Sequence, residues 1–197
     1  TKEDLENKIN FKFGVKNLLI TFHPVTLDEN SSSHQIDELL DAVASQEDTN
    51  LIFTFPNSDT DGRVIISKIR KFCETNNRNY VFYSSLGYLN YLSALQYVDG
   101  VIGNSSSGLI EAPSFRVGTI NIGDRQKGRI CAKSVINCKP EKKSIKKAIS
   151  KLYSEDFQNS LPYVDNPYGK GGASNKIVAK LEDIKLDGIL KKEFFNL

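Results

Sequence analysis

Short apolar blocks alternate along the chain with segments whose apolar residues recur every three or four positions. The short blocks are continuous, as at Leu18, Leu19 and Ile20, which is typical of strands buried on both faces of a parallel sheet. This pattern predicts strands at 16–22, 50–55, 80–83, 98–102, 117–122 and 134–136.

Helical spacing is seen in the segments between these blocks, for example in Ile36, Leu39, Leu40 and Val43. Helices are predicted at 1–10, 35–44, 63–75, 88–96, 108–115, 142–153 and 175–190. Because strands and helices alternate with short connections, we expect an α/β fold with a doubly wound parallel sheet. Residues 1–197 should form a single domain.

Composition narrows the possible functions. Hydrophobic residues make up 39% of the chain and charged residues 25%, as in a globular protein. The net charge is +2, which argues against a general nucleic-acid binder. No apolar run approaches the ~18–20 residues that a membrane span needs. We therefore expect neither nucleic acid nor a membrane as partner.

Cysteine and methionine usage adds two expectations. Cys73, Cys131 and Cys138 show no CxxC spacing, so a disulfide framework or a zinc site is not expected. We interpret them as buried or half-buried thiols of a cytoplasmic protein, and no metal site is predicted. Met is absent, even at position 1, which indicates a piece of a longer protein.

Unusual polar residues follow several of the predicted strands. They are His23, Asn57, the turn 103–108 and Arg125. Ligands of doubly wound sheets bind beyond the carboxyl ends of the strands. The sequence therefore places these residues on the edge of the sheet where a ligand is expected.

The turn 103–108 carries the strongest signal. It reads Gly-Asn-Ser-Ser-Ser-Gly and connects a buried strand to a helix whose first turn reaches Glu111. Free N–H groups and the positive end of a helix attract anions, and small residues let phosphate oxygens come close. Ser and Asn are also ordinary helix caps, so the local pattern leaves both interpretations open.

The other candidates are ambiguous on their own. His23 could contact a phosphate or a leaving-group oxygen, or could simply end its strand. Arg125 offers a fork suited to phosphate, and Asn57 could be no more than a turn former. A second Gly-rich loop at 167–174 is either phosphate-facing or a connector, and the basic stretch 139–151 is interpreted as a solvated helix face.

Taken together, several segments resemble the carboxyl-terminal half of the UDP-N-acetylglucosamine 2-epimerases. The likeness is closest to the hydrolysing branch, which makes N-acetylmannosamine or a related sugar for sialic- or legionaminic-type acids. The matching segments occur in the same order as in that family and span nearly the whole chain. They are 21–26, 55–59, 102–113, 118–129 and 166–171.

The resemblance implies a Rossmann-like domain that forms the carboxyl-terminal half of a GT-B fold. By motif, UDP would be bound by Asn57, Ser105, Ser106, Ser107, Gly108 and Glu111. The serines would contact the diphosphate and Glu111 the ribose. His23 and Arg125 would have the catalytic task of stabilising the departing UDP.

The resemblance also sets out what this chain would lack. The family's acid/base carboxylates come from an amino-terminal domain to which nothing here corresponds, so these residues alone are expected to be catalytically inactive. The full-length protein would be a homodimer or homotetramer acting on a UDP-sugar without a cofactor. Two alternatives remain open, a GT-B glycosyltransferase donor domain and a non-catalytic UDP-sugar sensor.

Overall fold

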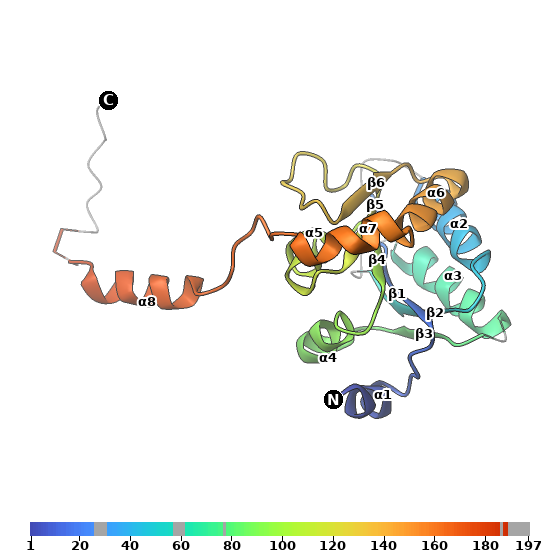
Figure 1. Cartoon of the computed structure of the whole chain (residues 1–197), viewed down its shortest axis with the longest axis horizontal. Helices are drawn as coiled ribbons and strands as arrows, with labels where there is room; N and C mark the ends of the chain where they lie inside the picture. Colours follow the sequence, from blue (N-terminus) through green and yellow to red (C-terminus); the bar gives the residue numbers. More distant parts are fainter. Residues whose placement is uncertain (26–30, 57–61, 77, 186, 189–197) are drawn as a thin grey trace.

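The computed structural model describes residues 1–25, 31–56, 62–76, 78–185 and 187–188. Within them, one parallel sheet has six strands in the order β3-β2-β1-β4-β5-β6 (Figure 1). The strands are β1 Lys16–Thr21, β2 Thr49–Thr54, β3 Tyr80–Tyr83, β4 Gly100–Gly103, β5 Gly118–Ile122 and β6 Val135–Cys138. The predicted doubly wound fold is confirmed.

Helices cover both faces of the sheet. The α-helices are α1 Lys2–Ile9, α2 Ser31–Ala44, α3 Gly62–Thr75, α4 Gly87–Ala94, α5 Ser107–Ile110, α6 Lys142–Leu152, α7 Glu155–Ser160 and α8 Ala173–Asp183. Two 3₁₀ helices are η1 Ala112–Phe115 and η2 Leu161–Tyr163. The apolar side chains of α2, α3 and α6 pack on one face, and those of α1, α4 and η1 pack on the other.

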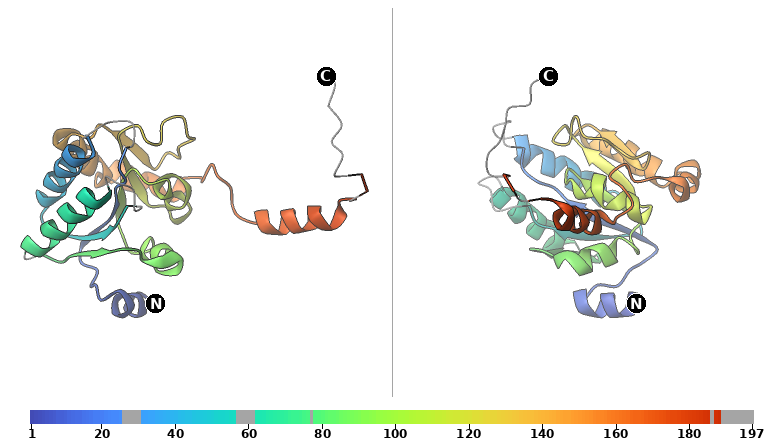
Figure 2. Two further views of the ribbon diagram at one scale, coloured as in Figure 1. Left: turned by 180° about the vertical axis from the view of Figure 1, so that it is seen from behind. Right: turned by 90° about the vertical axis from the view of Figure 1, so that its left-hand side faces the viewer.

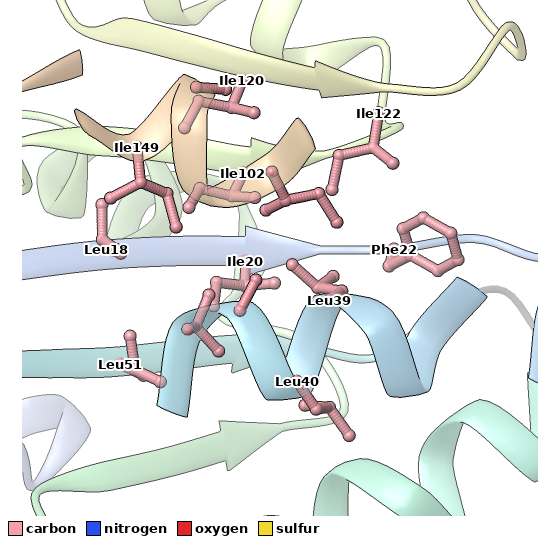
Figure 3. Close-up of a cluster of buried hydrophobic side chains, with 14 of the residues drawn as sticks. Leu18, Ile20, Phe22, Leu39, Leu40, Leu51, Ile102, Ile120, Ile122 and Ile149 are labelled. Carbon is pink, nitrogen blue, oxygen red and sulfur yellow. The ribbon is translucent and has the colours of Figure 1, made fainter. Parts of the chain in front are cut away.

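The core explains why the strands are apolar throughout. Leu18 and Ile20 of β1 point toward α2 and α6, whereas Leu19 points to the opposite face. Figure 3 shows the first of these clusters, with Leu39 of α2 and Ile149 of α6 directed at the strands. All five side chains are almost completely buried, and each contributes roughly 1.5–3 kcal/mol of transfer free energy.

The strand order places a crevice beside β1. From β1 the chain moves outward to β2 and β3, whereas from β4 it moves the other way to β5 and β6. The two halves meet where β1 pairs with β4, in the register Leu18 with Gly100 through Thr21 with Gly103. In sheets of this order, ligands bind at this switch point beyond the carboxyl ends of the strands.

One predicted helix is divided in the structure. A single helix was expected at 108–115, but α5 ends at Ile110 and η1 begins at Ala112. Pro113 lies in the first turn of η1, and its missing N–H group prevents an α-helix from continuing through it. Glu111 therefore lies between the two elements rather than inside a long helix.

The last helix stands apart from the sheet. Figures 1 and 2 show α8 extending away from the domain, and none of its residues is buried. Its apolar residues Ile177, Val178 and Leu181 are exposed, as is Leu89 of α4. Helical spacing thus predicted the presence of both helices, but α8 ends at Asp183 although the helix was predicted to reach residue 190, and the spacing did not indicate whether the apolar residues are buried.

The cysteine prediction was partly wrong. Cys73 is buried and Cys138 is half-buried, as expected, but Cys131 is exposed. Cys131 lies in the loop between β5 and β6, where no helix covers it. The structure contains no disulfide between these three residues, which are all free thiols.

Candidate functional site

The candidate site lies where β1, β4 and β5 end. His23 follows β1, the segment 104–107 follows β4, and Arg125 follows β5. The predicted site residues therefore come from neighbouring strands of the sheet and share one edge. Asn57 lies outside the residues that the structure describes.

Asn104 links the end of β1 to the turn that follows β4. Its side-chain Oδ1 accepts a hydrogen bond from the backbone N–H of His23 at 2.7 Å, and its Nδ2 donates to the His23 carbonyl at 2.8 Å. The residue is only 1% exposed. Because a buried amide needs partners for both polar atoms, this pair of bonds fixes the backbone of His23 beside the turn.

The carbonyl oxygen of Asn104 joins the third strand end. It accepts a hydrogen bond from Arg125 Nη1 at 3.0 Å and another from Gln126 Nε2 at 2.7 Å. The Arg125 side chain is thereby held against the turn, and its remaining N–H donors stay available for an anion. The role of Asn104 and Gln126 was not predicted, because both partnerships join residues far apart in the sequence.

Gly103 brings the turn unusually close to β1. Its φ is 139°, and a Cβ atom there would lie 1.9 Å from the carbonyl oxygen of Thr21. The N–H of Asn104 donates to that same oxygen at 3.3 Å. A residue other than glycine would push β4 away from β1 at the switch point.

The turn 103–108, which we call the serine turn, leads into α5. Ser106 is the N-cap residue, yet its side chain makes no capping hydrogen bond. The Ser106 hydroxyl is therefore not committed to the helix, whereas Ser105 Oγ accepts a hydrogen bond from the Ser107 N–H at 3.4 Å, as a capping side chain does. The Leu109 N–H donates to the Ser106 carbonyl at 3.0 Å, so the donors left at the start of α5, among the described residues, are the Gly108 N–H and the half-buried Ser105 and Ser106 hydroxyls.

Gly108 packs α5 closely on the sheet. A Cβ atom on Gly108 would lie 2.6 Å from the methyl group of Thr119, and the Thr119 hydroxyl donates to the Gly108 carbonyl at 2.7 Å. Gly108 thus allows the close contact between helix and strand, and its predicted contact with a ligand stays a prediction.

Glu111 carries a carboxylate oxygen without a partner. Its Oε2 atom is buried and has no hydrogen-bond donor among the described residues. Glu111 N–H donates to the carbonyl of Ser107, so the two side chains lie one helical turn apart. An unpartnered carboxylate oxygen beside a cluster of donors is suited to accept a hydrogen bond from a ligand hydroxyl.

A hollow adjoins the turn on the side of β2 and β3. It measures about 470 Å³ and lies between the ends of these strands and the start of α4. Thr54, Ser84, Ser85 and Tyr91 are among the residues that line it. Sequence reasoning missed this hollow because no single motif marks it.

Asn166, which precedes the second Gly-rich loop, contacts the far end of α5. Asn166 Nδ2 donates to the carbonyl of Ile110 and to Ser114 Oγ, both at 2.7 Å. Tyr168 donates its hydroxyl to the carbonyl of Ile130 at 3.0 Å. Asn166 therefore braces α5, and a direct role of the loop toward phosphate stays a prediction.

The described residues offer neither a metal site nor a membrane span. Within the described ranges, no group of three or more His, Cys, Asp or Glu side chains could hold a metal ion. No helix there has the length and apolar character needed to cross a membrane.

Comparison with known proteins decides the family. The family model described as UDP-N-acetylglucosamine 2-epimerase matches residues 1–182. The chain belongs to the UDP-N-acetylglucosamine 2-epimerase family. The resemblance inferred from the motifs is therefore confirmed, and the Ser-rich turn lies within the region that the model covers.

Two curated relatives of this 2-epimerase family member match its full length or nearly so. The GDP/UDP-N,N'-diacetylbacillosamine 2-epimerase (hydrolyzing) of Campylobacter jejuni is 37% identical over 100% of this chain and 51% of its own. The polysialic acid biosynthesis protein P7 of Escherichia coli is 38% identical over 98% of this chain and 50% of its own. The chain thus spans about half the length of these relatives.

A solved structure supports the fold of the family member. The crystal structure described as a UDP-N-acetylglucosamine 2-epimerase of Listeria monocytogenes superimposes with a TM-score of 0.69 at 20% identity. The match covers 90% of this chain and 46% of that one. The Rossmann-like fold expected for half of a GT-B protein is therefore confirmed.

Proposed function

We propose that this chain is the nucleotide-binding part of a hydrolysing UDP-N-acetylglucosamine 2-epimerase. The complete enzyme would release UDP and yield N-acetylmannosamine or its 2,4-diacetamido analogue. One observation carries the proposal. The hydrogen bonds of Asn104 hold His23, the serine turn and Arg125 together at the switch point of the sheet.

Each part of the nucleotide has a suitable partner at this edge. The diphosphate would lie on Ser105, Ser106, Ser107 and Gly108, where N–H groups and hydroxyls meet at the start of α5. The ribose hydroxyls would donate to Glu111, whose buried Oε2 lacks a donor in the described structure. The base would enter the neighbouring hollow of about 470 Å³.

The departing UDP needs positive charge near its terminal phosphate. Breaking the bond between the anomeric carbon and the phosphate oxygen leaves negative charge on that oxygen, while C2 loses a proton and a glycal forms. Arg125 and His23 would stabilise this charge from opposite sides of Asn104. Asn57 remains part of the proposed UDP contact set.

The remaining chemistry would come from a partner domain. Water must add to the glycal while C2 receives a proton on the opposite face, and the acid/base carboxylates for this step would lie in an amino-terminal domain. We further propose that the complete protein acts in the cytoplasm as a homodimer or homotetramer, without a metal ion. The chain alone would bind UDP weakly and show no turnover.

Calorimetric titration of the 197-residue chain with UDP tests the binding site. Ser106→Ala and Glu111→Ala should each weaken the affinity about tenfold, because each removes a charge-assisted hydrogen bond of roughly 1.5–3 kcal/mol. Ser150→Ala on the exposed side of α6 is the matched control and should leave the affinity unchanged. Unchanged affinity in both site variants would remove the proposed pocket.

Activity is tested on the complete protein of which this chain forms part. Incubation with UDP-N-acetylglucosamine, or with its 2,4-diacetamido analogue, and no acceptor should give free UDP and the C2-inverted sugar. Turnover that requires an acceptor would instead identify a glycosyltransferase. Binding without turnover under either condition would identify a sensor.

A further inference from the structure

Tyr91 connects the serine turn to α4, a helix that no sequence motif assigned to the site. It belongs to α4, and its hydroxyl forms a very short hydrogen bond with Ser107 Oγ, the first residue of α5. Tyr91 also lines the hollow beside β2 and β3. The residue therefore touches both the turn and the pocket next to it.

The chemistry of the two hydroxyls sets the direction of this bond. The pKa of Tyr91 is raised to about 12, mainly by burial, with the hydrogen bond to Ser107 acting to lower it and the negative charge of Glu111 contributing to the rise. The phenol therefore keeps its proton at neutral pH. A phenol is a stronger acid than an aliphatic alcohol, so Tyr91 is the better donor of the pair.

The Ser107 proton is then left for another acceptor. A serine hydroxyl has one donor and two acceptor lone pairs, so accepting from Tyr91 does not use its proton. Accepting a hydrogen bond also makes the hydroxyl a better donor, because polarisation passes along the chain. We propose that Tyr91 is a positioning residue that turns the Ser107 hydroxyl toward the diphosphate of the bound nucleotide.

A purely structural role would have different consequences. If Tyr91 only packed α4 against the sheet, removing its hydroxyl would change UDP affinity by the same factor with and without the Ser107 side chain. If Tyr91 acts by positioning the Ser107 hydroxyl, the effect of Tyr91 on UDP affinity disappears once the Ser107 side chain is removed. This inference rests on the proposed function, because it assumes that UDP binds at the turn.

A double-mutant cycle on UDP affinity separates the two roles. Tyr91→Phe should weaken UDP binding by the 197-residue chain about threefold to tenfold, which corresponds to one neutral hydrogen bond. In the Ser107→Ala background the same change should cost less than about twofold. Thermal unfolding of each variant verifies that the chain remains folded.

Tyr83→Phe is the matched control. It also removes a phenolic hydroxyl that bonds within the protein, to the carbonyl of Ile9, and should leave UDP affinity unchanged. An equal loss from Tyr91→Phe in both backgrounds, or no loss in either, would overturn the inference. Failure of the unaltered chain to bind UDP would instead overturn the proposed function itself.

Discussion

Gly103 passes so close to Thr21 that a Cβ atom there would lie 1.9 Å from the Thr21 carbonyl oxygen. This contact is made by backbone atoms of two paired strands, so neither side can move without disturbing the sheet. The approach places the serine turn directly over the end of β1. Because a Cβ atom at Gly103 would disturb both the pairing of β4 with β1 and the position of the serine turn, the fold and the site both depend on glycine at this position.

Gly103→Ala should therefore lower the free energy of unfolding by about 2–4 kcal/mol, measured by urea denaturation, from overlap and a strained φ. Gly123→Ala is the control, because Gly123 also has a positive φ of 72° but a Cβ there meets nothing within 4 Å. Its loss should be about 1 kcal/mol. Equal losses in the two variants would show that the contact with Thr21 is unimportant.

Asn104→Ala should cost about 2–3 kcal/mol in unfolding free energy, because it removes both hydrogen bonds that the Asn104 side chain makes to the half-buried backbone of His23. The same variant should also weaken UDP binding, since His23 and the turn lose their common anchor. Asn50→Ala, which removes an exposed amide bond to Lys12, should change neither quantity appreciably. Full stability of the Asn104 variant would contradict this account.

Arg125→Lys should weaken UDP binding about tenfold even though the charge is kept. A lysine cannot hold the Asn104 carbonyl and a phosphate with one planar fork. Lys146→Ala on the exposed face of α6 removes a full positive charge far from the site, so calorimetry should show unchanged affinity. If Lys146→Ala weakened UDP affinity more than Arg125→Lys does, long-range electrostatics would explain the affinity instead of a direct contact.

Stability should fall as the pH rises above about 9. Burial raises the pKa of both Cys73 and Cys138 from 9.0 to about 12, so the folded state keeps their protons longer than the unfolded chain does. Their contribution is complete below pH 9.0 and is lost toward pH 12. Urea denaturation across this range should show a shallower decline for the Cys73→Ala, Cys138→Ala double variant, whereas Cys131→Ala should follow the unaltered chain.

UDP affinity should be the same with and without EDTA. The donors proposed for the diphosphate are N–H groups, hydroxyls and Arg125, which neutralise phosphate without a cation. Calorimetry in chelator and in added Mg²⁺ provides the comparison. A clear gain with Mg²⁺ would mean that the phosphate charge is balanced in another way.

The sheet could be predicted from the sequence because its signal is local. Continuous apolar runs such as 18–20 mark strands buried on both faces, and helical spacing marks the crossings between them. The position of His23 and Arg125 at the same edge followed from strand direction alone. The strand order, and with it the position of the serine turn at the switch point, became known only from the structure.

Other features depend on contacts between distant residues and could not be predicted. Asn104 and His23 are separated by 81 positions, and Tyr91 reaches Ser107 from another helix. Leu89 of α4 is exposed among the described residues, which helical periodicity alone does not report. By contrast, Pro113 was a local signal that should have divided the predicted helix at 108–115.

Asn104 uses its polar groups entirely within the protein, through bonds to Thr21, His23, Arg125 and Gln126. Under the proposed function, it would contribute to UDP binding without touching the nucleotide. The strand ends are ordered when the chain folds, so a nucleotide arriving there should meet donors already in place. Binding of the nucleotide should therefore cost little conformational entropy at these strand ends. The backbone there should have nearly the same shape with and without the nucleotide.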